Sequence, residues 1–104
     1  MESTLVKVGF AKSELEFKGL ASHKEDDKER VIHFKKIEGD VPNILNKHLM
    51  AWSVSVNGNE NYKDTLIYLC EDKANKGQYQ FTIHKKEPEN KFEVQPQGKS
   101  TVAE

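Results

Sequence analysis

Apolar and polar residues alternate in several short segments, which is the pattern of strands with one buried face. Val6, Val8 and Phe10 alternate with polar or small residues, and further alternating segments follow along the chain. They predict strands at residues 6–10, 14–19, 31–37, 53–56, 79–83 and 92–94. Thr65–Cys70 is apolar on both faces, which is typical of a central strand. Short polar connections favour antiparallel pairing of these strands.

One segment, at about residues 41–51, shows the period of about 3.6 residues that is typical of an amphipathic helix. Asp40 is a suitable N-cap, and Pro42 suits the first helical turn because it needs no N–H donor there. The apolar stripe consists of Val41, Ile44, Leu45, His48, Leu49 and Trp52. The sequence thus predicts an α+β, β-rich fold: a curled antiparallel sheet or small partly open barrel of about six to seven strands with this one helix.

Three polar segments, 23–30, 57–64 and 71–77, are predicted to be exposed loops. Asn57-Gly58-Asn59 is a turn signal, and the polar residues after it predict a connection longer than a two-residue hairpin. We expect residues 1–94 to form a single globular domain. Residues 95–104 lack a pattern and are expected to be a mobile tail.

Charge and composition narrow the class of protein. The chain of 104 residues has 16 lysines and arginines against 17 acidic residues, for a net charge of −1, so it is not a globally basic nucleic-acid binder. Arg30 is the only arginine, which disfavours bidentate recognition of phosphate or guanine. The N-terminus lacks signal-peptide features, and no apolar run approaches the roughly 20 residues of a membrane helix. We therefore expect a cytoplasmic protein that does not interact with a membrane.

The sequence offers no plausible catalytic or metal-binding set. None of the four histidines lies at a ligand spacing from another or from the only cysteine, Cys70. Cys70 lies in an apolar segment and is predicted to be buried, and His48 is predicted to be a core residue of the helix. We expect no disulfide, no metal and no cofactor, and a protein that is not an enzyme.

The leading hypothesis is a small binding protein that acts through another protein's surface, as an inhibitor or an accessory factor. Tyr62, Asn59 and Lys63 lie in a predicted loop and are the expected contacts, because an exposed aromatic residue is a natural anchor. We also expect a homodimer, formed through an exposed edge of the first or the last strand.

The alternative is a single-stranded nucleic-acid-binding protein with an oligonucleotide-binding-like barrel. In that case Lys85, Lys86 and Lys91 would contact phosphates next to aromatic residues that stack on bases. The aromatic candidates are Trp52, Tyr62, Tyr68, Tyr79, Phe81 and Phe92. Alternation instead assigns Tyr79, Phe81 and Phe92 to the core.

Overall fold

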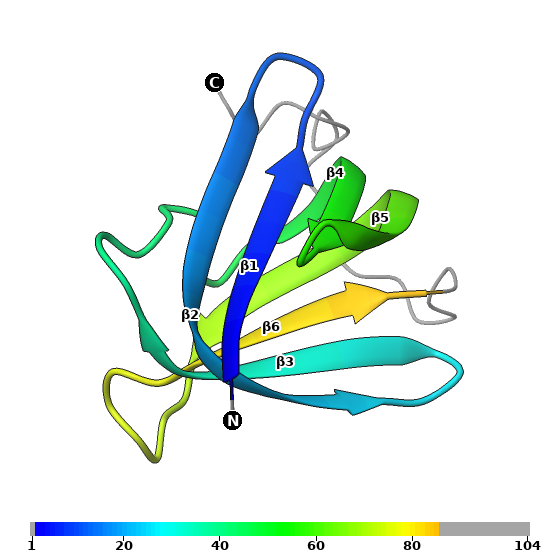
Figure 1. Cartoon of the computed structure of the whole chain (residues 1–104). Coiled ribbons are helices and arrows are strands. Elements are labelled where there is room, and N and C mark those ends of the chain that lie inside the picture. The colour runs from blue at the N-terminus through cyan, green and yellow to red at the C-terminus, as the bar shows by residue number, and fades with distance from the viewer. Residues whose placement is uncertain (1, 86–104) are drawn as a thin grey trace.

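The alternating segments form six strands, and all neighbouring strands are antiparallel (Figure 1). The protein is described by a computed structural model over residues 2–85. The strands are β1 (Glu2–Gly9), β2 (Glu14–Glu25), β3 (Glu29–Ile37), β4 (His48–Val56), β5 (Asn59–Glu71) and β6 (Tyr79–His84). The prediction of a β-rich antiparallel fold is confirmed.

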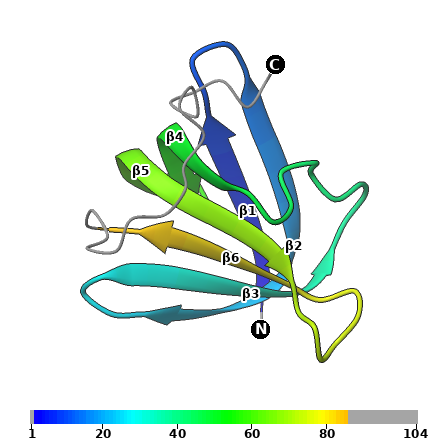
Figure 2. The same ribbon diagram turned by 180° about the vertical axis from the view of Figure 1, so that it is seen from behind.

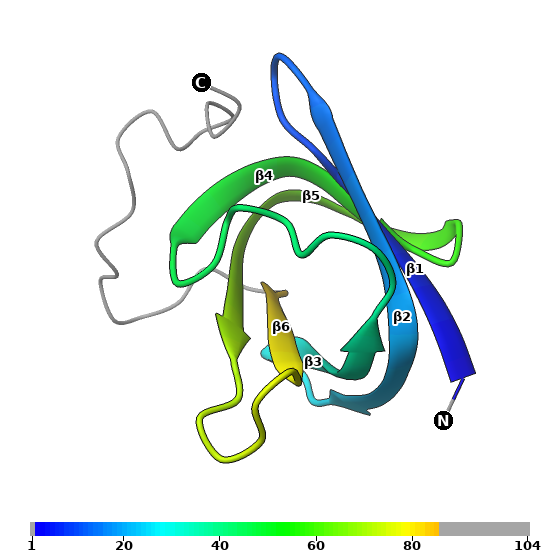
Figure 3. The same ribbon diagram turned by 90° about the vertical axis from the view of Figure 1, so that its left-hand side faces the viewer.

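The sheet closes into a barrel with the strand order β1-β2-β3-β6-β5-β4. β6 lies between β3 and β5, as the views from both sides show (Figure 2). Pairing of Val6–Gly9 in β1 with β4 completes the ring. The connection from β3 to β4 passes across one end of the barrel (Figure 3). There Ile44 is buried and the backbone N–H of Asn46 donates to the carbonyl of Leu69 at 2.7 Å, so this connection closes that end.

Inward-facing side chains of all six strands fill the barrel. Phe17 of β2 packs against Phe34 of β3 and edge-on against Phe81 of β6, with ring centroids 5.5 and 5.3 Å apart. Edge-to-face packing of this kind adds to the stability gained from burying the rings. The assignment of Phe81 to the core is confirmed, and Tyr79 packs against the core while remaining half-buried.

The predicted helix at 41–51 is wrong, because the described residues contain no helix. Residues 41–47 form the irregular connection across the barrel end, and β4 begins at His48. Ile44 plugs the barrel end, whereas Leu49 and Ala51 are buried as alternate residues of a strand. The helical spacing therefore arose because an irregular connection and a strand follow each other directly in the sequence.

Two of the three predicted loops are largely strand. In the segment 23–30, β2 continues to Glu25 and β3 starts at Glu29, because the Asp26 carboxylate accepts the backbone N–H of Glu29 at 2.9 Å and tightens the turn. In the segment 57–64, β5 starts at Asn59. Asn57 and Gly58 both have positive φ, so the connection is a two-residue turn and not the longer one predicted. The third predicted loop, after β5, is confirmed.

Barrel closure bears on the expected homodimer. In the described part of the chain β1 pairs with β2 from Glu2 to Gly9 but with β4 only from Val6 to Gly9, so barrel closure covers the expected edge of the first strand over its second half. The expected strand at 92–94 and the expected tail at 95–104 lie outside the described residues. Within residues 2–85 there is no helix long and apolar enough to cross a membrane.

Candidate functional site

The barrel end opposite the β3–β4 connection is lined by a chain of polar side chains from four strands. The Arg30 Nη1 donates to the Tyr62 hydroxyl at 3.3 Å, and its Nη2 lies 3.2 Å from His23 Nδ1. The other nitrogen of His23, Nε2, lies 3.1 Å from Thr4 Oγ1, whose residue is fully buried. The only arginine of the chain therefore links β2, β3 and β5 at this end.

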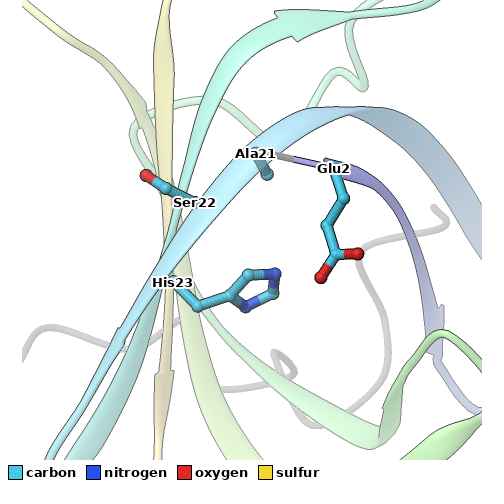
Figure 4. Close-up of a pocket in the computed structure, with 4 residues that line it drawn as sticks. All are labelled: Glu2, Ala21, Ser22 and His23. Atoms are coloured by element: carbon cyan, nitrogen blue, oxygen red, sulfur yellow. The ribbon is translucent and has the colours of Figure 1, made fainter.

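The hydrogen bonds with Arg30 and Thr4 determine which ring nitrogen of His23 carries the proton. A guanidinium only donates hydrogen bonds, so Nδ1 of His23 accepts from Arg30 and Nε2–H donates to Thr4. Burial, and then the positive charge of Arg30, lower the pKa of His23. Figure 4 shows its ring directed to the same side of β2 as Glu2, and Ser22 directed away. A neutral His23 in this setting orients Arg30.

A shallow pocket of about 390 Å³ lies at this end of the barrel. It is lined by Glu2, Ala21, Ser22 and His23 (Figure 4). His23 already uses both ring nitrogens on Thr4 and Arg30, and Ser22 points to the opposite side of β2. The pocket therefore presents no paired nucleophile and base of the kind that covalent catalysis needs.

The expected contact residues Tyr62, Asn59 and Lys63 are on β5 and not in a loop. Tyr62 is half-buried, packs against the core and accepts a hydrogen bond from Arg30. Lys63 is exposed on the outer face, because successive strand residues point to opposite sides. Asn59 is exposed beside the turn, where it pairs with Val56. The structure therefore separates Tyr62, which packs against the core, from the exposed Lys63 and Asn59.

The lysines expected in the nucleic-acid alternative are only partly described. The Lys85 ammonium donates to the Glu25 carboxylate and, at 2.7 Å, to the carbonyl of Asp26. The hydrogen bond from Lys85 lowers the pKa of Glu25, as expected for a paired carboxylate. Lys86 and Lys91 lie outside the described residues.

Trp52 is the most exposed large hydrophobic side chain of the described residues, with 65% of its surface accessible. It follows Ala51, which is buried. The pairing of β4 with β1 covers Ser53–Val56, so Trp52 comes directly before the paired residues. The buried positions of β4 shift there, since both Ala51 and Val54 face the core. The helix prediction places Trp52 on a buried stripe, which is wrong, whereas its place among the candidate stacking residues requires the exposed ring that the structure shows.

The other candidate side chains, His48 and Cys70, are partly buried among neighbouring residues. His48 stacks on Tyr68, with ring centroids 4.0 Å apart, and burial lowers the pKa of His48. Cys70 is half-buried, and burial raises the pKa of its thiol. No cluster of three or more histidine, cysteine or acidic side chains suited to a metal ion occurs within residues 2–85.

No protein-family model matches the chain, and no curated protein or solved structure shows significant similarity to it.

Proposed function

We propose that the protein is a small, non-enzymatic binding protein that docks another protein on the outer face of β4, with Trp52 as its anchor. The observation that carries the proposal is a tryptophan 65% exposed in the middle of a strand. Tryptophan is enriched among residues that dominate binding energy at protein interfaces. In this proposal the protein acts in the cytoplasm, as an inhibitor or an accessory factor.

The exposed area is large enough to matter. A tryptophan side chain can bury roughly 150–250 Å², so its exposed part corresponds to about 100–160 Å². At about 25 cal/mol per Å², covering this area contributes about 2.5–4 kcal/mol. That range is typical of an interface hot spot.

The surroundings of Trp52 favour a protein over a nucleic acid. Its neighbours on β4 include the uncharged Met50, Ser53 and Ser55. Of the two exposed lysines opposite these serines, Lys7 lies 3.9 Å from Glu16, which leaves Lys63 as a single cation beside the ring. Single-stranded nucleic acid is held where cations and stacking rings alternate along one groove. The expected phosphate contact Lys85 is instead paired with Glu25 on a different part of the barrel. A partner protein with an apolar side chain matches this surface better.

The test captures partners from a lysate of the source cells with the tagged wild type, with Trp52→Ala and with Leu20→Ala, each with and without nuclease. Leu20 is a matched comparison for a partner bound at β4, because it is the other exposed large hydrophobic residue of the described chain and lies on β2. A captured protein that is lost with Leu20→Ala but kept with Trp52→Ala is bound at another surface and does not support this proposal. The captured protein is then purified and titrated against each variant. Since Trp52 is the only tryptophan, its fluorescence reports directly on contact at this face.

We expect a protein that survives nuclease, that binds Leu20→Ala as it binds the wild type, and that binds Trp52→Ala about thirtyfold or more weakly. Its binding should also shift the emission of Trp52 to shorter wavelength. A partner set that disappears with nuclease would support the nucleic-acid alternative. Binding that is unchanged in Trp52→Ala would show that this face is not the docking surface.

A further inference from the structure

A second surface, on the outside of β2 and β3, concentrates positive charge. Lys18 and Lys24 are exposed on β2, and Lys35 and Lys36 are exposed on β3. Leu20, 44% exposed, lies on β2 directly opposite Lys36. We call these five residues the β2–β3 face.

A β-bulge produces the double lysine at the centre of this face. Leu20 pairs with Lys36, but the next residue of β2, Ala21, pairs with Phe34, so Lys35 is the extra residue. Phe34 is buried and both lysines are exposed. A bulge therefore directs two consecutive ammonium groups to the outside beside an exposed leucine.

Gly19 makes the bulge fit. A Cβ atom at Gly19 would lie 1.8 Å from the carbonyl oxygen of Lys36, so any side chain there would collide with the bulged backbone. Close approach of another backbone is a common reason for glycine within a strand. The exposed positions of Lys35 and Lys36 thus depend on the bulge in β3 and on the absence of a side chain at Gly19.

Lysines outnumber the acidic residues at this face of the described chain. Two nearby acidic residues have other partners, since Glu16 lies 3.9 Å from Lys7 and Glu25 is paired with Lys85. A third, Glu38, is exposed next to Lys18, whose carbonyl accepts the Glu38 backbone N–H at 2.8 Å. Among the ion pairs within residues 2–85, none uses Lys35 or Lys36. The centre of the face, at Lys35 and Lys36, is therefore positive although the whole chain has a net charge of −1.

We infer that the β2–β3 face binds an acidic segment of a partner protein, with an apolar side chain of that segment packed on Leu20. Charge complementarity selects the anionic partner. The apolar centre of the face is aliphatic, whereas single-stranded nucleic acid needs aromatic stacking platforms. The exposed ring of Trp52 lies on β4, with β1 between β4 and β2. This inference is independent of the proposed role of Trp52.

The probe is a short fluorescein-labelled peptide rich in glutamate with a central pair of leucines, titrated by fluorescence anisotropy at physiological salt. A peptide with serines in place of the leucines and an oligothymidylate of equal charge serve as comparison probes. The protein variants are Lys35→Glu/Lys36→Glu, Leu20→Ser and, as a matched charge control on the β5–β6 turn, Lys73→Glu/Lys76→Glu. Amide chemical shifts locate the contact on the wild type.

We expect the leucine peptide to bind and to shift amides of the β2–β3 face. Lys35→Glu/Lys36→Glu should weaken binding by about tenfold or more, and Leu20→Ser should remove the preference for leucine over serine. Trp52→Ala and Lys73→Glu/Lys76→Glu should bind as the wild type does. Equal losses in both lysine pairs, no shifts on this face, or tighter binding of the oligothymidylate would overturn the inference. Circular dichroism confirms that each variant is folded.

Discussion

Replacement of Gly19 by alanine tests the strand geometry behind the β2–β3 face. The new Cβ would meet the Lys36 carbonyl oxygen at 1.8 Å and the Ile37 Cα at 2.9 Å. Both are backbone atoms, so no side-chain rotation relieves the contact. The bulged part of β3 must retreat by more than an ångström before the methyl group fits.

The cost follows from the hydrogen bonds that this movement disturbs. Retreat of β3 loosens the pairing of Gly19 with Ile37 and of Leu20 with Lys36. It also disturbs the hydrogen bond from the backbone N–H of Glu38 to the Lys18 carbonyl, which is 2.8 Å long. With about 1 kcal/mol for each of these three weakened interactions and about 1–3 kcal/mol for overpacking, we expect a loss of about 4–6 kcal/mol. In a domain of this size, at about 4–8 °C for each kcal/mol, that corresponds to a fall in Tm on the order of 16–48 °C.

Gly9→Ala is the matched control for thermal and urea denaturation. A Cβ at Gly9 would meet the Ser53 hydroxyl at 2.7 Å, and that hydroxyl can rotate away. Alanine also reduces the conformational freedom of the unfolded chain, so we expect Gly9→Ala to stay within about 1 kcal/mol of the wild type. If Gly19→Ala unfolds as late as Gly9→Ala does, the reasoning is refuted, and the bulge that displays Lys35 and Lys36 is absent.

Further predictions concern pH, the core and the thiol. Burial is the main cause that lowers the pKa of His23, His48 and His84, so on acidification the unfolded chain takes up protons first. The urea midpoint should therefore be constant between about pH 7 and 8 and fall as the pH drops below about 6.5, and a rise on acidification would contradict the assignment. Phe81→Ala should cost about 3–5 kcal/mol in urea unfolding, since its ring is fully buried; a change below about 1 kcal/mol would place it outside the core. Cys70 should react with a thiol reagent more slowly in native than in unfolded protein, because burial raises its pKa; equal rates would show an exposed thiol.

The strands that sequence could predict are those with regular alternation. Val6 and Val8, or Phe81 and Ile83, lie two residues apart and face one core, so their pattern reports directly on structure. The pattern around Trp52 led to a wrong helix prediction. Ile44 is buried in the β3–β4 connection, and the strand that follows it shifts its buried positions between Ala51 and Val54. Together they imitate a helical period. No local rule separates the two cases, since the crossing of the barrel end is decided by the tertiary fold.

The candidate contacts were harder to predict, because exposure of a side chain depends on strand register. Tyr62 was expected to be exposed since its neighbours are polar, yet it faces inward and meets Arg30, which is distant in sequence. Lys35 and Lys36 carried a usable local signal. Two consecutive lysines between Phe34 and Ile37 break the two-residue alternation, as a bulge requires.

The two proposed surfaces share one structural origin. At Trp52 and at the pair Lys35 and Lys36, a strand departs from strict alternation and places successive residues outside the barrel. Regular strands of a small closed barrel give each outward side chain neighbours on both adjacent strands, which limits how far it projects. Local departures overcome that limit, and bulges commonly serve to re-aim side chains. The irregular positions of β3 and β4 are therefore where this barrel can hold a tryptophan and a lysine pair clear of their neighbours for a partner.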